Sequence, residues 1–297
     1  SARLAGRVDI SNQTRLDLET RAQLATASPG TPDLPADLAK LPLRSDVGAS
    51  LGLTHRFNRF ELALKGAYEH IVWDDSKLTN GMTASNRDRN YDQYGAQLRG
   101  SYELTPGVKP FVEAGADARV HELAVDFAGV ARDSVGFVAR AGTTFEMTRK
   151  LTGEVSIGYL DRVYKDASLP ELRGAITEAS LVWSATPLTT LRLIGKSSVE
   201  ETILPGVSGT LVRDARVEVE HAFRRWLIGT LKFGVGSDSY VGSSRVDHRY
   251  AVSAAITYKL SRVAQLKGEA RREWRTSNVI GGDYAANVFL AGIRLQR

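Results

Sequence analysis

The chain of 297 residues contains no cysteine and only two methionines. The lack of cysteine excludes disulfides, thiolate metal sites and a cysteine nucleophile. Long apolar runs are also missing. The longest uncharged stretch, residues 179–191, contains Pro187 and is too short for a membrane-spanning helix, which needs about 20 apolar residues. Because 42% of the residues are hydrophobic, intrinsic disorder is excluded as well, and a folded chain is expected.

A strong charge of one sign is absent too. The 39 Lys and Arg against 34 Asp and Glu give a net charge of +5, and the two signs are interspersed along the chain. A nucleic-acid-binding protein would gather its basic residues into a tract or patch. The sequence therefore predicts no nucleic-acid partner.

Apolar residues recur at every second position over nearly the whole chain. The alternation is clear in residues 60–69, 94–104, 135–146 and 249–260, where polar residues occupy the positions between. A period of two indicates β-strands with two different faces. These runs last roughly 11 to 14 residues, longer than the 5 or 6 of a common globular strand.

The connections between the runs alternate between short turns and long polar loops. Short turns are expected at residues 11–13, 57–59, 105–107, 148–150, 186–188, 224–225 and 262–263. Long loops are expected at about 27–45, 73–92, 122–133, 164–173, 202–210, 239–247 and 277–284. Short turns on one rim and long loops on the other are typical of an outer-membrane barrel. A β-propeller is the alternative at this hairpin spacing, but a blade would divide each repeat into four short strands.

Aromatic residues on the apolar face fall into two groups near the strand ends. Such rings mark the two membrane interfaces of a lipid-exposed barrel. The girdle beside the short turns comprises Phe60, Tyr102, Phe145, Trp183, Phe223 and Tyr258. The girdle beside the long loops comprises Tyr68, Tyr94, Phe137, Tyr159, Phe233, Tyr250 and Trp274.

The opposite face carries many charged residues, which a dry core would not tolerate without large desolvation costs. A hydrated lumen tolerates them. The expected pore-lining residues are Arg15, Arg21, Lys65, Arg99, Arg119, Arg140, Arg192, Lys196, Arg216, Glu218, Glu220, Arg249, Lys259, Lys267, Glu269, Arg271, Glu273 and Arg275. Basic residues slightly outnumber acidic ones on this face, which predicts a weak preference for anions, with Arg271 and Arg275 as its main source.

The in-phase strands are joined by turns such as residues 104–107 and 147–151, and the chain ends with the segment Val288 to Arg297. In these features the sequence resembles, over essentially its whole length, the β-barrel porins of Gram-negative outer membranes. Many such barrels finish on an aromatic residue, whereas this chain finishes Leu295-Gln296-Arg297. The resemblance implies one all-β domain over residues 1–297: a transmembrane antiparallel up-and-down β-barrel of about 14 to 16 strands, integral to the bacterial outer membrane.

Fifteen strands are expected, whereas bacterial single-chain barrels have even numbers. The expected ranges are 3–10, 14–26, 46–56, 59–72, 93–104, 108–121, 134–147, 151–163, 174–185, 189–201, 211–223, 226–238, 248–261, 264–276 and 285–295. Either a sixteenth strand precedes Ser1, or residues 1–13 extend the next strand and the barrel has fourteen. The first alternative is favoured.

No catalytic, cofactor or metal site is expected, because the sequence has no Gly-x-Ser-x-Gly or His-Glu-x-x-His motif and its five histidines are scattered. Glu218 and Glu220 share a strand face, but salt-bridged wall residues fit them better than acid/base partners.

The leading hypothesis is a passive channel for small hydrophilic solutes, narrowed by loop 27–45. The alternative is a partner-gated export or scaffold barrel, for example for extracellular polysaccharide. The expected partners are outer-membrane lipid and lipopolysaccharide, together with a second copy of the chain or another envelope protein.

Overall fold

The computed structural model describes residues 1–26, 34, 37–148 and 150–295. It is almost entirely β-structure, and one 15-stranded antiparallel sheet dominates it. The strands of this sheet are β1 (Ala2–Asp9), β2 (Thr14–Thr26), β4 (Leu43–Phe57), β5 (Phe60–Trp73), β8 (Tyr91–Tyr102), β9 (Val108–His121), β10 (Ser134–Thr148), β11 (Leu151–Tyr164), β12 (Leu172–Thr186), β13 (Thr189–Glu200), β14 (Gly209–Arg224), β15 (Leu227–Val241), β16 (Val246–Lys259), β17 (Ala264–Ser277) and β18 (Tyr284–Leu295).

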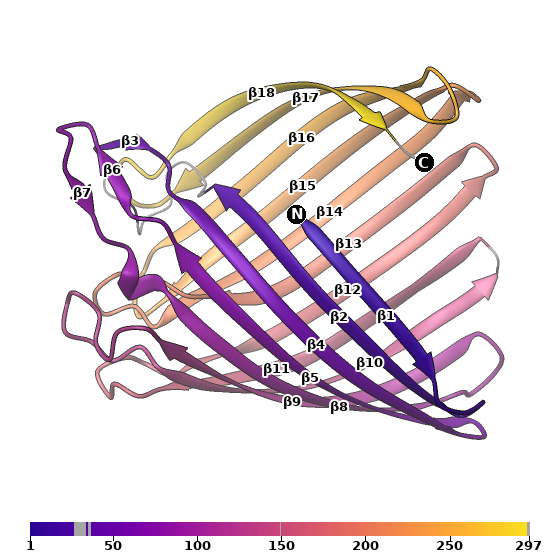
Figure 1. Cartoon of the computed structure of the whole chain (residues 1–297), viewed down its shortest axis with the longest axis horizontal. Helices are drawn as coiled ribbons and strands as arrows, with labels where there is room; N and C mark the ends of the chain where they lie inside the picture. Colours follow the sequence, from indigo (N-terminus) through magenta and orange to yellow (C-terminus); the bar gives the residue numbers. More distant parts are fainter. Residues whose placement is uncertain (27–33, 35–36, 149, 296–297) are drawn as a thin grey trace.

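Neighbours in this sheet follow the order of the chain, with β1 and β18 as its two outermost strands. The result is an up-and-down β-barrel wall that curls around a central space (Figure 1). The predicted fold class is confirmed. Because Asp9 pairs with Arg15 in a hairpin between β1 and β2, residues 1–13 do not extend the next strand, and the fourteen-strand alternative is wrong.

Short turns and long loops lie at opposite ends of the barrel, as the sequence predicts; the long loops lie on the left in Figure 1. The second predicted long loop contains two short strands, β6 (Ser76–Leu78) and β7 (Thr83–Ala84), and a 3₁₀ turn, η1 (Arg87–Arg89). These strands form a small second sheet with β3 (Leu38–Lys40). One expectation is wrong: the loop predicted at 239–247 shrinks to residues 242–245, because β15 and β16 extend past the predicted strand ends.

Candidate functional site

Charged side chains on β8 to β12 converge on one face of the sheet. Arg99 on β8 forms ion pairs with Glu113 on β9 at 3.1 Å and with Glu154 on β11 at 2.5 Å. Arg140 on β10 pairs with the same Glu113 at 3.0 Å and with Glu178 on β12 at 2.5 Å. Side chains from strands three apart can meet only on the concave side of a curved sheet, so this is the inner face of the barrel.

The register of the strands shows which predicted residues share this inner face, because directly paired residues in antiparallel strands point the same way. The predicted set alternates in phase with Arg99 and Arg140 through every strand on which it lies: Arg15, Arg21, Lys65, Arg119, Arg192, Lys196, Arg216, Glu218, Glu220, Arg249, Lys259, Lys267, Glu269, Arg271, Glu273 and Arg275. Their role in lining a pore stays a prediction. Sequence reasoning missed Glu178, the partner of Arg140.

The predicted aromatic residues lie on the opposite, outer face. At the long-loop end, the rings of Tyr68 and Tyr94 are 5.2 Å apart, and those of Tyr250 and Trp274 are stacked at 5.5 Å. At the short-turn end, the ring centroids of Tyr258 and Trp226 are 5.0 Å apart. Trp226 was not among the predicted girdle residues. The register places most of the remaining predicted rings in the same two bands: Phe60, Tyr102, Phe137, Phe145, Tyr159, Trp183 and Phe233. Phe223 lies at an irregularity in the register, with its ring 4.8 Å from that of outer-face His221.

Some outer-face residues are charged; they lie just beyond the aromatic girdle of the long-loop end. Asp161 pairs with Arg173 at 3.2 Å, and His70 lies 2.7 Å from Asp92. Arg213 occupies a similar position, paired in register with serines on both neighbouring strands. Charges at this level fit the headgroup region better than the hydrocarbon core.

The long-loop end of the β13–β14 hairpin lies across the inner face. Arg119 on β9 forms an ion pair with Glu201, just after β13, and donates to the carbonyl oxygen of Val199 at 3.2 Å. Both ion-pairing side chains are about 90% buried, with exposed fractions of 9% and 11%. Because β9 and β13 are four strands apart in the sheet, residues 201–208 fold inward; we call them the infolded loop.

Arg132, in the loop before β10, binds the backbone of the infolded loop. Its guanidinium donates to the carbonyl oxygens of Thr202, Leu204 and Val207 at 2.5, 3.0 and 2.9 Å, and to Asp126 at 2.6 Å. The side chain is 1% exposed. A buried cation with four hydrogen-bond acceptors is costly to disturb, so the infolded loop is firmly attached.

Apolar packing completes the attachment. Leu211 on β14 belongs to a buried cluster with Leu160, Leu169, Leu172 and Ile176 from β11, β12 and the loop between them. This cluster was not predicted from the sequence.

The neighbouring loop between β11 and β12 carries a hydrogen-bonded carboxylate that braces the same region. Donation from the Ser168 hydroxyl and from the backbone amides of Ser168 and Ala131 lowers the pKa of Asp166. Asp166 stays ionised and ties this loop to the segment that contains Arg132. The predicted narrowing element, loop 27–45, falls partly on residues 27–33 and 35–36, which lie outside the described residues.

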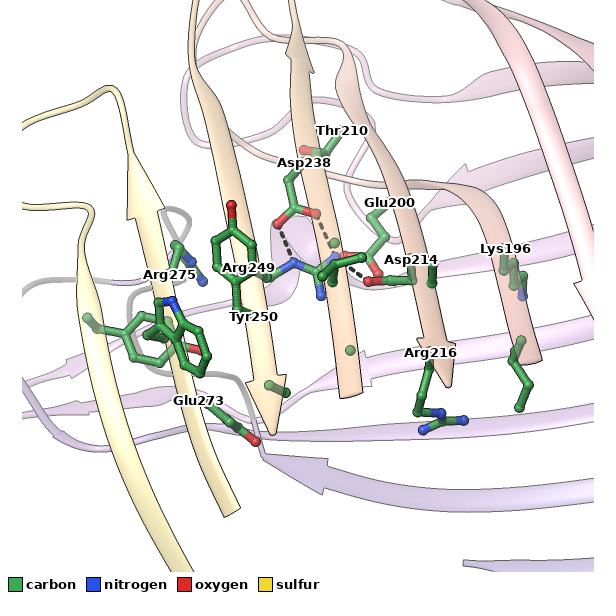
Figure 2. A pocket seen from close by; sticks show the side chains of 18 of the residues that line it. Lys196, Glu200, Thr210, Asp214, Arg216, Asp238, Arg249, Tyr250, Glu273 and Arg275 are labelled. Atoms are coloured by element: carbon green, nitrogen blue, oxygen red, sulfur yellow. Dashed lines mark hydrogen bonds and ion pairs between the residues drawn. The ribbon is translucent and has the colours of Figure 1, made fainter. Parts of the chain in front are cut away.

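A cavity of about 580 Å³ lies beside the infolded loop, against β13 to β18. Figure 2 shows Lys196 and Arg216 on one side of it and Glu273 and Arg275 on the other. Arg249 lies between them and pairs with Asp238 at 2.7 Å. The cavity therefore presents both signs of charge to the inside of the barrel.

A comparison with protein families gives a match over residues 1–297 to the family described as "Putative beta-barrel porin 2". The chain belongs to this porin family. It is accordingly an integral outer-membrane β-barrel. No curated protein matches the sequence.

Two of the solved outer-membrane proteins similar to this chain share its fold at low sequence identity. The FrpB iron transporter from Neisseria meningitidis is 6% identical, with a TM-score of 0.53 over 93% of this chain and 50% of its own. FpvA of P. aeruginosa, solved bound to pyoverdines, is 9% identical, with a TM-score of 0.51 over 92% of this chain and 48% of its own. This porin-family chain thus spans about half the length of both. A bacterial polysaccharide outer membrane secretin is 13% identical, with a TM-score of 0.42 over 99% of this chain and 90% of that one.

Metal clusters and membrane-spanning helices are both missing from the described residues. No group of three or more His, Asp or Glu side chains there could hold a metal ion. No helix in that part of the chain is long and apolar enough to cross a membrane.

Proposed function

We propose that this barrel is a passive outer-membrane channel for small hydrophilic solutes with a weak preference for anions. The observation that supports this proposal is the charged inner face, which extends across the sheet while the outer face is apolar between its aromatic girdles. Charges in such number stay ionised only where water reaches them. Rings of charged side chains set the ion preference of such channels. No enzymatic activity is part of the proposal.

The infolded loop supplies the narrowest part of the proposed channel. Its attachment by Arg119 and Arg132 keeps it across one side of the inner space, leaving the cavity beside it as the continuation of the path. Solute size is then limited by a fixed element of the wall and its loops.

Planar-bilayer recording of the purified protein tests the proposal. Steady open-state current in potassium chloride, with a modestly larger permeability for chloride than for potassium, is the expected result. A protein that inserts, shown by its heat-modifiable migration on gels, yet carries no current would refute passive diffusion.

The second candidate is a partner-gated export or scaffold barrel, and the buried contacts of Arg132 favour it. An element held by three carbonyl oxygens and a carboxylate is suited to closing a barrel at rest. If the barrel is partner-gated, the wild-type protein is silent in a bilayer and the Arg132→Gln variant conducts. Current in the wild-type protein decides against it.

Outer-membrane lipid and lipopolysaccharide are the proposed partners of the outer face. Arg173 and Arg213, just beyond the aromatic girdle of the long-loop end, are suited to contact headgroup phosphates. Reduced copurification of lipopolysaccharide with a variant carrying Arg173→Gln and Arg213→Gln, at unchanged folding, is the expected result, and unchanged copurification would refute it.

A further inference from the structure

Lys196 and Arg216 are close neighbours on the inner face, on β13 and β14. Lys196 is directly opposite Asp214, and Arg216 is opposite Ile194, so the two cationic residues are diagonal neighbours. Diagonal positions in an antiparallel pair are about 7–8 Å apart, within reach of long side chains. Both ammonium and guanidinium groups can therefore contact one small anion.

Neither side chain forms an ion pair or hydrogen bond within the part of the chain that the structure describes. The carboxylates directly opposite Lys196, Asp214 and Glu178, are engaged by other cations, whereas Glu200, further along β13, lines the cavity without an ion pair in the described part of the chain. Asp214 pairs with Arg249 at 2.9 Å, and Glu218 pairs with Arg192 at 2.7 Å. The two cations thus face the cavity without a partner of opposite charge.

The wall beside Arg216 is nearly bare. Arg216 is opposite Gly234 on β15, which in turn is opposite Ala251 on β16, so no long side chain fills the space. Two residues further along β15, Gly236 lets Arg249 reach across the strand, because a Cβ atom there would lie 2.5 Å from the Asp214 carboxylate and 3.0 Å from the Arg249 guanidinium. The glycines both open the cavity and keep Arg249 occupied.

The far side of the cavity offers hydrogen-bond acceptors. Asp238 on β15 and Glu273 on β17 line that side, and the Thr210 hydroxyl lines the cavity from β14, the strand of Arg216. The cavity volume of about 580 Å³ is within the usual range of a small-molecule site, about 300–1,000 Å³. Lys196 and Arg216, which have no carboxylate partner among the described residues, lie at one side, and the carboxylates at the other side are paired with Arg249 and Arg271 but keep free lone pairs. This arrangement suits a ligand with a negative group and several hydroxyl groups.

We propose that this cavity is a binding site for a hydroxylated organic anion, whose carboxylate or phosphate group contacts Lys196 and Arg216. Arg216 supplies planar, paired donors to the oxyanion, and Lys196 supplies a mobile point charge. The hydroxyl groups donate to Asp238 and Glu273. The proposal rests on the proposed function in one respect, namely that the inner face is reached by solutes.

Isothermal titration of the full barrel in detergent tests the site directly. The probes are gluconate, which carries a carboxylate, glucose 6-phosphate, which carries a phosphate, and neutral glucose. We expect at least one anion to bind at least tenfold more tightly than glucose, and the stronger of the two identifies the group that is recognised. Equal affinity for glucose, or no anion binding, would overturn the proposal.

The variant K196Q/R216Q should weaken anion binding at least tenfold. A matched control, K65Q/K259Q, removes the same charge from inner-face lysines that do not line the cavity. Equal losses in both variants, or unchanged affinity in K196Q/R216Q, would show that the cavity is not the site. If K196Q/R216Q fails to fold, R216K keeps the charge and removes the paired donors; unchanged affinity in that variant then counts against the proposal.

Conductance of the same preparations separates the two proposals. Anion binding without current refutes the channel and leaves the site standing. Current without anion binding refutes the site and leaves the channel standing.

Discussion

The guanidinium of Arg119 on β9 is ion-paired with the carboxylate of Glu201, although their strands are four apart in the sheet. The pair spans the inside of the barrel rather than its wall, and both groups are nearly buried. Together with the contacts of Arg132, it holds the infolded loop against the inner face.

Removing the Arg119–Glu201 ion pair should widen the proposed channel. Arg119→Gln leaves Glu201 buried without its cation, and breaking a buried pair in this way costs about 3–5 kcal/mol. We expect the infolded loop to detach at least part of the time, with a larger and noisier single-channel conductance. Arg87→Gln, which breaks the more exposed pair with Glu122, is the control and should leave the conductance unchanged. Identical conductance in wild type and Arg119→Gln would exclude a narrowing role for the loop.

The assignment of the outer face can be checked on a single strand. Leu98 lies midway between Tyr94 and Tyr102 on β8, so Leu98→Arg places a charge near the bilayer midplane and should cost about 2–4 kcal/mol of unfolding free energy. Gln97→Glu places a charge on the inner face, opposite Lys65, and should cost less than about 1 kcal/mol. Urea titration in lipid vesicles measures both; similar losses would contradict the assignment.

Arg99→Leu is not a suitable neutral control for that experiment. From the sequence, Arg99 is an inner-face residue in contact with water, but its side chain is only 28% exposed, and it pairs with Glu113 and Glu154. Its loss leaves two carboxylates with fewer partners, so this substitution should destabilise the barrel.

The turn between β8 and β9 depends on a glycine. Gly107 has a φ of +83°, and a Cβ atom there would lie 2.4 Å from the carbonyl oxygen of Glu146. Gly281 has a similar φ of +80° but open space around it. Gly281→Ala should cost about 1 kcal/mol from its backbone conformation alone, and Gly107→Ala clearly more, because the steric clash adds to that cost. Equal effects in urea unfolding would show that the close approach is relieved without cost.

The ion pairs of the structure change which residues are expected to set the ion preference. The sequence favours Arg271 and Arg275, but Arg271 is 2.6 Å from Glu273, and Arg275 is 5% exposed and lies 3.6 Å from Asp247. Lys196 and Arg216 have no such partners in the described part of the chain. Reversal potentials in a salt gradient should therefore shift toward cation preference in K196Q/R216Q more than in R271Q/R275Q. The shift should fade near 1 M salt, where the screening length is about 3 Å. The opposite order would restore the expectation drawn from the sequence.

The strands were predictable because each carries its own signal. Alternation places the start of β2 at residue 14, as observed, and β8 ends and β9 begins on either side of the predicted turn at residues 105–107. The inner and outer faces follow from the same alternation, since a strand that is apolar on one side and charged on the other can satisfy both environments in only one orientation. Strand ends were less certain: β4 begins at Leu43 and β14 at Gly209, a few residues before the predicted starts.

The infolded loop and its cavity were not predictable in this way. Residues 202–210 have the composition of an ordinary solvated loop. Nothing near Arg132 in the sequence indicates that its guanidinium binds carbonyl oxygens 70 or more positions away. Pairing also decides which charges are available to a solute. Arg216 and Arg249 look alike in the sequence, yet only Arg249 reaches a carboxylate, because Gly236 lets it cross β15.

Solute entry into liposomes tests passive diffusion most directly. Liposomes reconstituted with the barrel are placed in iso-osmotic solutions of neutral sugars of increasing size, and swelling is followed by light scattering. A passive channel predicts fast swelling with monosaccharides, a steep decline with larger oligosaccharides, and a higher size limit for Arg119→Gln. Liposomes that hold folded wild-type barrel and swell no faster than protein-free ones would contradict it.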